Sequence, residues 1–139
     1  MIAALLARDP AALPDAAAST MARLKGAYSV VAIVGDALVA FRDPHGIRPL
    51  TLGRIGDDWV VASESCALDL VGAERVRDVR PGEVVWVDGG GFHSSQAVPA
   101  RRHAACIFEH VYFARPDSRL GGGEVHMERV RMGERLADE

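Results

Sequence analysis

The sequence predicts an α+β fold, with antiparallel strands in the middle of the chain and helices toward both ends. From Gly26 onward, short runs rich in Val, Ile and aromatic residues replace an Ala-rich start. The connections between these runs are too short for the crossover helices that parallel strands require, so we expect antiparallel neighbours. Several runs are apolar on both faces, which indicates a sheet that is covered on both sides.

Two short helices are expected at the start of the chain, in "MIAALLAR" and "PDAAASTMARLK". Asp15 follows Pro14 where the second helix would begin, and Lys25 precedes Gly26 where it would end. The first run begins at residue 1 without an N-cap residue. The last run, "EVHMERVRMGERLADE", has helical spacing and also ends without a cap. We therefore expect that both ends are cut from a longer domain.

Four strands are expected in the first half of the chain, in "AYSVVAIV", "ALVAFR", "LTLGRI" and "WVVAS". Gly35 and Asp36 suit a two-residue hairpin turn between the first two. A short helix in "ESCALDLVG" should end at Gly72. Further strands follow in "AERVRDV", "EVVWVD" and "GFHSSQ", the last two joined by a glycine turn at residues 89–91. The polar segment "AVPARRHAA" is the one plausible linker.

The composition argues against nucleic-acid and membrane partners. The 139 residues carry a net charge of −3, and their charges are interspersed, so no basic patch is available for phosphate groups or anionic lipids. No stretch approaches the ~20 apolar residues of a membrane span. The two cysteines lie far apart in a chain with enough apolar residues for a core, which favours reduced thiols in a cytoplasmic protein.

The segment "HAACIFEH" combines a thiol with two imidazoles. On a helix, His103, Cys106 and His110 would share one face and could bind zinc, with Glu109 or a remote residue as the fourth ligand. Cys106 with either histidine could alternatively form a nucleophile and its base. The structural alternative is a buried, unreactive thiol between apolar neighbours, which is also the interpretation of Cys66.

The loop "RDPHGIRPL" is the most ordered connection in the sequence. Its proline and glycine favour a fixed turn, and the charges of Arg42, Asp43 and Arg48 could hold it through an Arg–Asp pair as a rigid hairpin connection. Contact with a substrate is the alternative. The triple glycines at residues 89–91 and 121–123 lack the spacing of a phosphate-binding loop, so we expect flexible turns there.

Taken in order, several motifs resemble the bacterial amidophosphoribosyltransferases. They are "GAYSVVAI", "VAFRDPHGIRPLTLG", "VVASESCALD", "VRDVRPGEVVWVD", "CIFEHVYFARPDS" and "RMGERLA". The loop and the following Ala-Ser-Glu are also similar to other class II glutamine amidotransferases, such as asparagine synthetase. The segment "FEHVYFARPDS" narrows the resemblance to the purine enzyme. The resemblance covers nearly the whole chain.

This resemblance implies both a fold and an activity. Residues 1–104 would form the C-terminal part of an N-terminal-nucleophile domain, an αββα sandwich with antiparallel sheets. Residues 105–139 would form the bridge to a phosphoribosyltransferase domain and its first helix. Members of the family are both glutamine amidotransferases and glycosyltransferases. They use glutamine to convert phosphoribosyl pyrophosphate into 5-phosphoribosylamine at the start of purine synthesis.

The resemblance also implies which functional residues the chain lacks. The nucleophilic cysteine would lie upstream of residue 1 and the phosphoribosyl pyrophosphate loop downstream of residue 139. No catalytic residue is therefore assigned, substrate-binding residues are unassigned, and the chain alone is expected to be inactive. In a longer parent, which would use Mg²⁺ and form homo-oligomers, Cys106 would be one ligand of a [4Fe-4S] cluster. His126 would lie near the channel between the domains.

Two other functions are compatible with the sequence. The chain could be a non-catalytic half-domain that acts as a partner subunit of a class II amidotransferase. It could also be a small metal or thiol enzyme built on Cys106 and its histidines. If it is half of a sandwich, an apolar sheet face is uncovered, and we expect the isolated chain to aggregate or dimerise.

Overall fold

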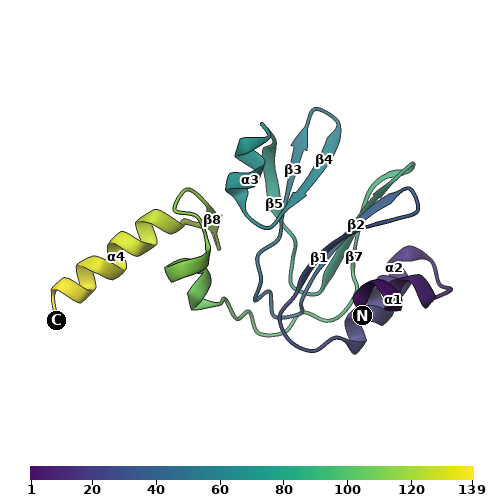
Figure 1. Cartoon of the computed structure of the whole chain (residues 1–139), viewed down its shortest axis with the longest axis horizontal. Coiled ribbons are helices and arrows are strands. Elements are labelled where there is room, and N and C mark those ends of the chain that lie inside the picture. The colour runs from purple at the N-terminus through teal and green to yellow at the C-terminus, as the bar shows by residue number, and fades with distance from the viewer.

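A computed structural model describes all residues from 1 to 139 and shows two antiparallel sheets with helices outside them (Figure 1). The elements are α1 (Ile2–Arg8), α2 (Leu13–Arg23), β1 (Ser29–Val34), β2 (Ala37–Arg42), β3 (Thr51–Ile55), β4 (Asp58–Ala62), α3 (Ser65–Leu70), β5 (Glu74–Asp78), β6 (Glu83–Asp88), β7 (Gly91–Gln96), the π-helical turn η1 (Glu109–Phe113), β8 (Arg119–Leu120), β9 (Gly123–Glu124) and α4 (Val125–Ala137). The mixed α and β fold with antiparallel pairing confirms the predicted class. None of the helices is long and apolar enough to cross a bilayer.

The strands divide between two sheets, which corrects the expectation of four consecutive hairpin neighbours. One sheet has the order β1-β2-β6-β7 and the other the order β4-β3-β5, while β8 and β9 pair separately. The turn between β1 and β2 is the predicted two-residue hairpin, with Gly35 at a φ of +59°. The segment after β2, however, leaves the first sheet, and residues 43–50 carry the chain to the second. We call these residues the crossing loop.

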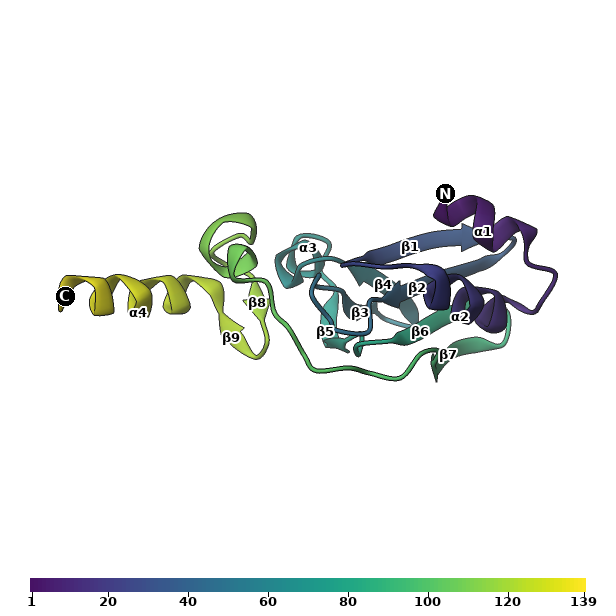
Figure 2. The ribbon, with the colours of Figure 1, turned by 90° about the horizontal axis from the view of Figure 1, so that it is seen from below.

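The two sheets and their helices form four layers. Helices α1 and α2 cover one face of the first sheet, where a cluster of buried apolar residues includes Met21 of α2 and Phe41 of β2. The opposite face packs on the second sheet through a second cluster that includes Ala40 and Leu52. Helix α3 covers the outer face of the second sheet, because the Leu68 side chain lies against the backbone of β3 at Gly53. The order is helix, sheet, sheet, helix (Figures 1 and 2).

The predicted two-sided burial is correct for β2 and β6 and wrong for β1. Both β2 and β6 bury side chains on either face. Strand β1 is an edge strand, and the second sheet does not extend over it. Val31 and Ile33 are consequently 48% and 78% exposed. A run of apolar residues does not by itself distinguish a central strand from an edge strand.

Two helix ends test the predicted stop signals. Helix α3 ends as predicted before Gly72, whose φ is +71°. The Gly72 N–H donates to Asp69 O at 3.1 Å and the Ala73 N–H to Leu68 O at 2.9 Å, the two bonds of a Schellman motif. Helix α2 ends at Arg23, a little earlier than Gly26 predicted.

The last part of the chain projects from the layered body. An extended segment, residues 97–106, follows the body and corresponds to the predicted linker (Figure 2). It leads to residues 107–139, which we call the C-terminal arm and which contain η1, β8, β9 and α4. Helix α4 forms where helical spacing predicted it, and its apolar residues Met127, Val130 and Leu136 are exposed.

Candidate functional site

The crossing loop is organised by a buried carboxylate. Asp43 is fully buried, and its Oδ1 accepts the His45 N–H at 2.9 Å. Its Oδ2 accepts the N–H groups of Ile47 at 3.0 Å and Arg48 at 3.3 Å. A buried carboxylate is tolerated only when it is well hydrogen-bonded, and here the backbone of the loop satisfies it. Asp43 therefore determines the conformation of the loop.

Arg42 holds the same loop from the other side. Its guanidinium donates to the carbonyl oxygens of Arg48 at 2.7 Å, Val79 at 2.9 Å and Gly46 at 2.8 Å. Burial lowers the pKa of this guanidinium from its ordinary value, although the carboxylates of Asp78 and Asp43 oppose the change. The prediction of a hairpin held by an Arg–Asp pair is thus wrong in detail. The loop crosses between sheets, and each charged side chain binds backbone groups instead.

Gly46 is required at the tip of this loop. Its φ is +62°, and an added Cβ would lie 2.8 Å from Cγ of Pro81 and 3.2 Å from Cδ2 of His103. Both a left-handed backbone and a close neighbour therefore exclude larger residues. This contact brings the loop, the turn before β6 and the later part of the linker to one place.

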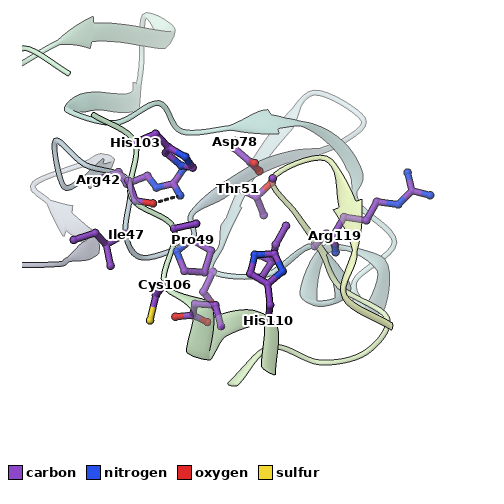
Figure 3. A pocket seen from close by; sticks show the side chains of 16 residues that line it. Arg42, Ile47, Pro49, Thr51, Asp78, His103, Cys106, His110 and Arg119 are labelled. Carbon is purple, nitrogen blue, oxygen red and sulfur yellow. Dashed lines mark hydrogen bonds between the residues drawn. The ribbon is translucent and has the colours of Figure 1, made fainter. Parts of the chain in front are cut away.

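A small polar cavity lies where the crossing loop meets the C-terminal arm (Figure 3). Its wall includes Arg42 and Asp78 from the body, His103 from the linker, and His110 and Arg119 from the arm. The cavity has a volume of about 80 Å³. One water molecule needs ~10–15 Å³ by a comparable measure, whereas drug-sized ligands occupy pockets of roughly 300–1,000 Å³. The cavity accommodates several water-sized molecules and does not enclose a substrate of amino-acid size.

The structure does not assemble the metal or nucleophile site that "HAACIFEH" could form. His103 and Cys106 lie in the extended linker, and only His110 belongs to a helical turn. All three line the same cavity, but no group of three His, Cys, Asp or Glu side chains is placed to hold a metal ion. In Figure 3 the thiol of Cys106 and the imidazole of His110 point in different directions. The prediction failed because it assumed one continuous helix.

The cysteines do not by themselves fit an iron-sulfur cluster. Cys66 belongs to α3 and is buried, as the sequence predicted for a core thiol, and Cys106 is partly exposed. A [4Fe-4S] cluster takes four ligands, and only one thiol here is accessible to it. Cys106 could contribute one ligand, and the other three would have to come from residues outside this chain.

Arg48 joins the crossing loop to the arm, a role that the sequence did not predict. It forms an ion pair with Glu109 of η1, whose side chain is almost fully buried. Its guanidinium carbon also lies 5.6 Å from the ring centroid of Phe113, within the range of a cation–π contact. No local pattern links positions this far apart in sequence, so the pairing emerges only from the fold.

His126 lies in the first turn of α4 and its side chain is exposed. Its backbone N–H donates to Pro116 O at 2.9 Å. It does not line the cavity of about 80 Å³ described above. A place for His126 beside a channel between domains therefore stays a prediction.

Comparisons with known proteins give one consistent family. The chain is 46% identical over 142 aligned positions to the amidophosphoribosyltransferase of Mycobacterium tuberculosis, covering 100% of this chain and 27% of the relative. The enzyme of Pasteurella multocida is also 46% identical, over 94% of this chain and 27% of that relative. For that of Archaeoglobus fulgidus the identity is 45%, over 84% of this chain and 25% of the relative. No protein-family model matches.

Solved structures agree with the sequence relatives. The glutamine phosphoribosylpyrophosphate amidotransferase of B. subtilis, solved with ADP and GMP, superposes with a TM-score of 0.93 at 38% identity. The match covers 99% of this chain and 30% of that structure. The chain thus spans about a quarter to a third of the length of the proteins that it matches.

Proposed function

We propose that this chain, which belongs to the amidophosphoribosyltransferase family, provides part of an enzyme that transfers ammonia from glutamine to phosphoribosyl pyrophosphate. The product would be 5-phosphoribosylamine, at the first committed step of purine synthesis. Within that enzyme, residues 1–104 would be the C-terminal part of the N-terminal-nucleophile glutaminase domain. Residues 105–139 would be the bridge and the first helix of the phosphoribosyltransferase domain.

The observation that carries this proposal is the match along the whole chain. A TM-score of 0.93 over 99% of the chain means that body, linker and arm are arranged as in the B. subtilis enzyme. A shared fold alone would not support a function, because one fold serves many activities. Here the fold is accompanied by 46% identity to curated relatives that share one name.

The proposal includes groups that other parts of such an enzyme would supply. Glutamine and phosphoribosyl pyrophosphate would be the substrates, and Mg²⁺ would accompany the pyrophosphate. Cys106 would contribute one ligand if the enzyme carries an iron-sulfur cluster, and His126 would lie near the channel between the domains. We further propose a cytoplasmic homo-oligomer that binds neither nucleic acid nor membrane.

A chimera tests the proposal directly. Residues 1–139 would replace the aligned segment of the M. tuberculosis enzyme, and the control would carry the same junctions around the original segment. We expect glutamine-dependent formation of phosphoribosylamine by both proteins, to within about tenfold of each other. The isolated chain should release no ammonia from glutamine, because Cys66 is buried and Cys106 has no oriented base.

Two outcomes would contradict the proposal. The first is a chimera that folds and assembles like the control but forms no phosphoribosylamine from glutamine. The second is ammonia release by the isolated chain, since that would require a complete glutaminase site within these residues.

A further inference from the structure

A cluster of hydrogen bonds beside the cavity joins the body to the arm. We call it the clamp, and it consists of Glu64 and Ser65 at the start of α3 with Arg115, Ser118 and Arg119 of the arm. Glu64 Oε2 accepts the Ser118 hydroxyl at 2.6 Å and the Arg115 backbone N–H at 2.9 Å. The Ser65 hydroxyl oxygen accepts the Arg119 N–H at 2.8 Å.

The clamp is protected from water at its centre. Ser118 is fully buried and Ser65 is 5% exposed. A short hydrogen bond to a carboxylate is stronger than one between neutral groups, and it is weakened least where water is excluded. The clamp therefore holds the turn between residues 115 and 119 firmly against α3.

The same turn determines the direction of α4. The Val125 N–H donates to Ser118 O at 3.0 Å, and the His126 N–H donates to Pro116 O. From the far side, Arg129 of α4 donates through Nε to His110 O at 2.7 Å and through Nη2 to Ala114 O at 2.8 Å. Helix α4 is thus fastened to the rest of the arm by hydrogen bonds at both the turn and η1.

Few other contacts hold the arm in place. The linker is bonded to the body through four backbone N–H groups, those of Ala97 and Val98 to Gly82 O, Arg101 to Pro44 O and Ala104 to His45 O. All four lie at or before residue 104, so they do not hold the arm itself. Apart from the clamp, the arm is tethered to the body by the ion pair of Arg48 with Glu109. The orientation of the arm therefore depends on that ion pair and on the clamp.

We propose that Glu64 is a positioning residue that sets the orientation of the C-terminal arm relative to the body. In the enzyme proposed above, on which this consequence rests, the arm would connect the ammonia-producing and ammonia-consuming domains. Glu64 would then keep the two domains aligned, so that ammonia released by one reaches the other. It would do so without contacting substrate.

The first test measures the arm in the isolated chain. Hydrogen exchange of the backbone amides between residues 115 and 126 is compared in the native chain, Glu64→Ala and the control Glu74→Ala. Glu74 is exposed and makes no side-chain hydrogen bond. We expect exchange about tenfold faster in Glu64→Ala, because the buried Ser118 hydroxyl and the Arg115 N–H lose their acceptor, and unchanged exchange in Glu74→Ala. Equal exchange in all three proteins would overturn the inference.

A conservative variant separates positioning from general instability. All the donors that meet Glu64 do so at Oε2, so the carbonyl oxygen of Glu64→Gln can take that place. We expect Glu64→Gln to retain most of the protection, and the body, residues 1–96, to exchange alike in every variant. Faster exchange throughout the body of Glu64→Ala would show a merely structural role and would overturn the proposal.

The second test uses the chimera and measures how closely glutamine hydrolysis is coupled to the formation of phosphoribosylamine. We expect the rate of glutamine hydrolysis by Glu64→Ala to stay within about twofold of that of the parent chimera. The amount of glutamate released per phosphoribosylamine formed should rise at least about twofold. Glu64→Gln and Glu74→Ala should keep the parental ratio. An unchanged ratio in Glu64→Ala would overturn the coupling role. If the parent chimera is inactive, the proposed function fails, while the exchange test still decides whether Glu64 positions the arm.

Discussion

At the scale of single residues, buried charged groups in this chain are satisfied mainly by backbone. Asp43 accepts three N–H groups, and Arg42 donates to three carbonyl oxygens. Glu83 is satisfied mainly by a side chain instead. It accepts two hydrogen bonds from the Arg77 guanidinium, at 2.7 and 2.8 Å, and one from the Arg80 N–H. Each arrangement fixes the backbone of a connecting segment, the crossing loop for Arg42 and Asp43 and the turn before β6 for Glu83.

Replacing Gly46 tests how tightly the crossing loop is packed. Both Gly46→Ala and the control Gly56→Ala place alanine at a φ near +60°, which costs roughly 1–2 kcal/mol. Gly56 has open space around it, whereas Gly46 faces Pro81 at 2.8 Å. We expect Gly46→Ala to lose a further ~1–3 kcal/mol of unfolding free energy through overpacking. Urea unfolding measures the difference, and equal losses for the two variants would refute the assigned contact.

Glu83 makes part of the stability dependent on pH. Burial would raise the pKa of this carboxyl, but the hydrogen bonds from Arg77 and Arg80 outweigh it and hold the pKa below the ordinary 4.5. Because the folded-state pKa is lower than the unfolded one, the stabilisation is complete above pH 4.5 and is lost as the pH falls through the folded value.

The variant Glu83→Gln measures this contribution. At about pH 7 we expect it to be less stable than the native chain by ~1–3 kcal/mol, because Arg77 loses a charged, bidentate partner. The difference should be smaller at about pH 3, because the stabilisation by the Glu83 carboxylate is lost progressively once the pH falls below 4.5. Urea unfolding at both pH values measures the stability difference between the variant and the native chain. A difference that does not change with pH would contradict the lowered pKa of Glu83.

At the scale of elements, β1 is the exposed part of the layered body. It is an edge strand with free backbone groups, and its outward side chains Val31 and Ile33 are apolar. Natural proteins protect such edges with charges, bulges or a covering segment. An uncovered apolar edge favours pairing with another chain.

Ile33→Lys tests whether this edge drives self-association. We expect the native chain to form dimers or larger species at micromolar concentration, and the variant to shift toward monomer, because lysine on an edge strand opposes pairing. Light scattering coupled to size exclusion measures the shift. Lysine at the exposed Ile55, on β3, is the control and should have a smaller effect, because β3 has partners on both sides. A monomeric native chain would contradict the expectation.

At the scale of the whole molecule, two parts meet at two points. The body carries both apolar clusters, and the arm has none of its own. The meeting points are the Arg48–Glu109 pair and the clamp at Glu64. Polar contacts of this kind fix the orientation of the two parts more than they add to stability. They therefore suit a connection that sets the angle between the body and the arm.

The sequence by itself predicted the class, the positions of the helices and of strands β1 to β7 but not η1, β8 or β9, and the resemblance to one family. Those depend on local periodicity, on turn residues such as Gly35 and Gly72, and on motifs that are contiguous in the chain. Only the tertiary structure decided that the crossing loop changes sheets, that Arg48 pairs with Glu109, and that Glu64 holds the arm. The reason is physical: these features join residues distant in sequence, and a contact across that distance leaves no periodic trace in either partner.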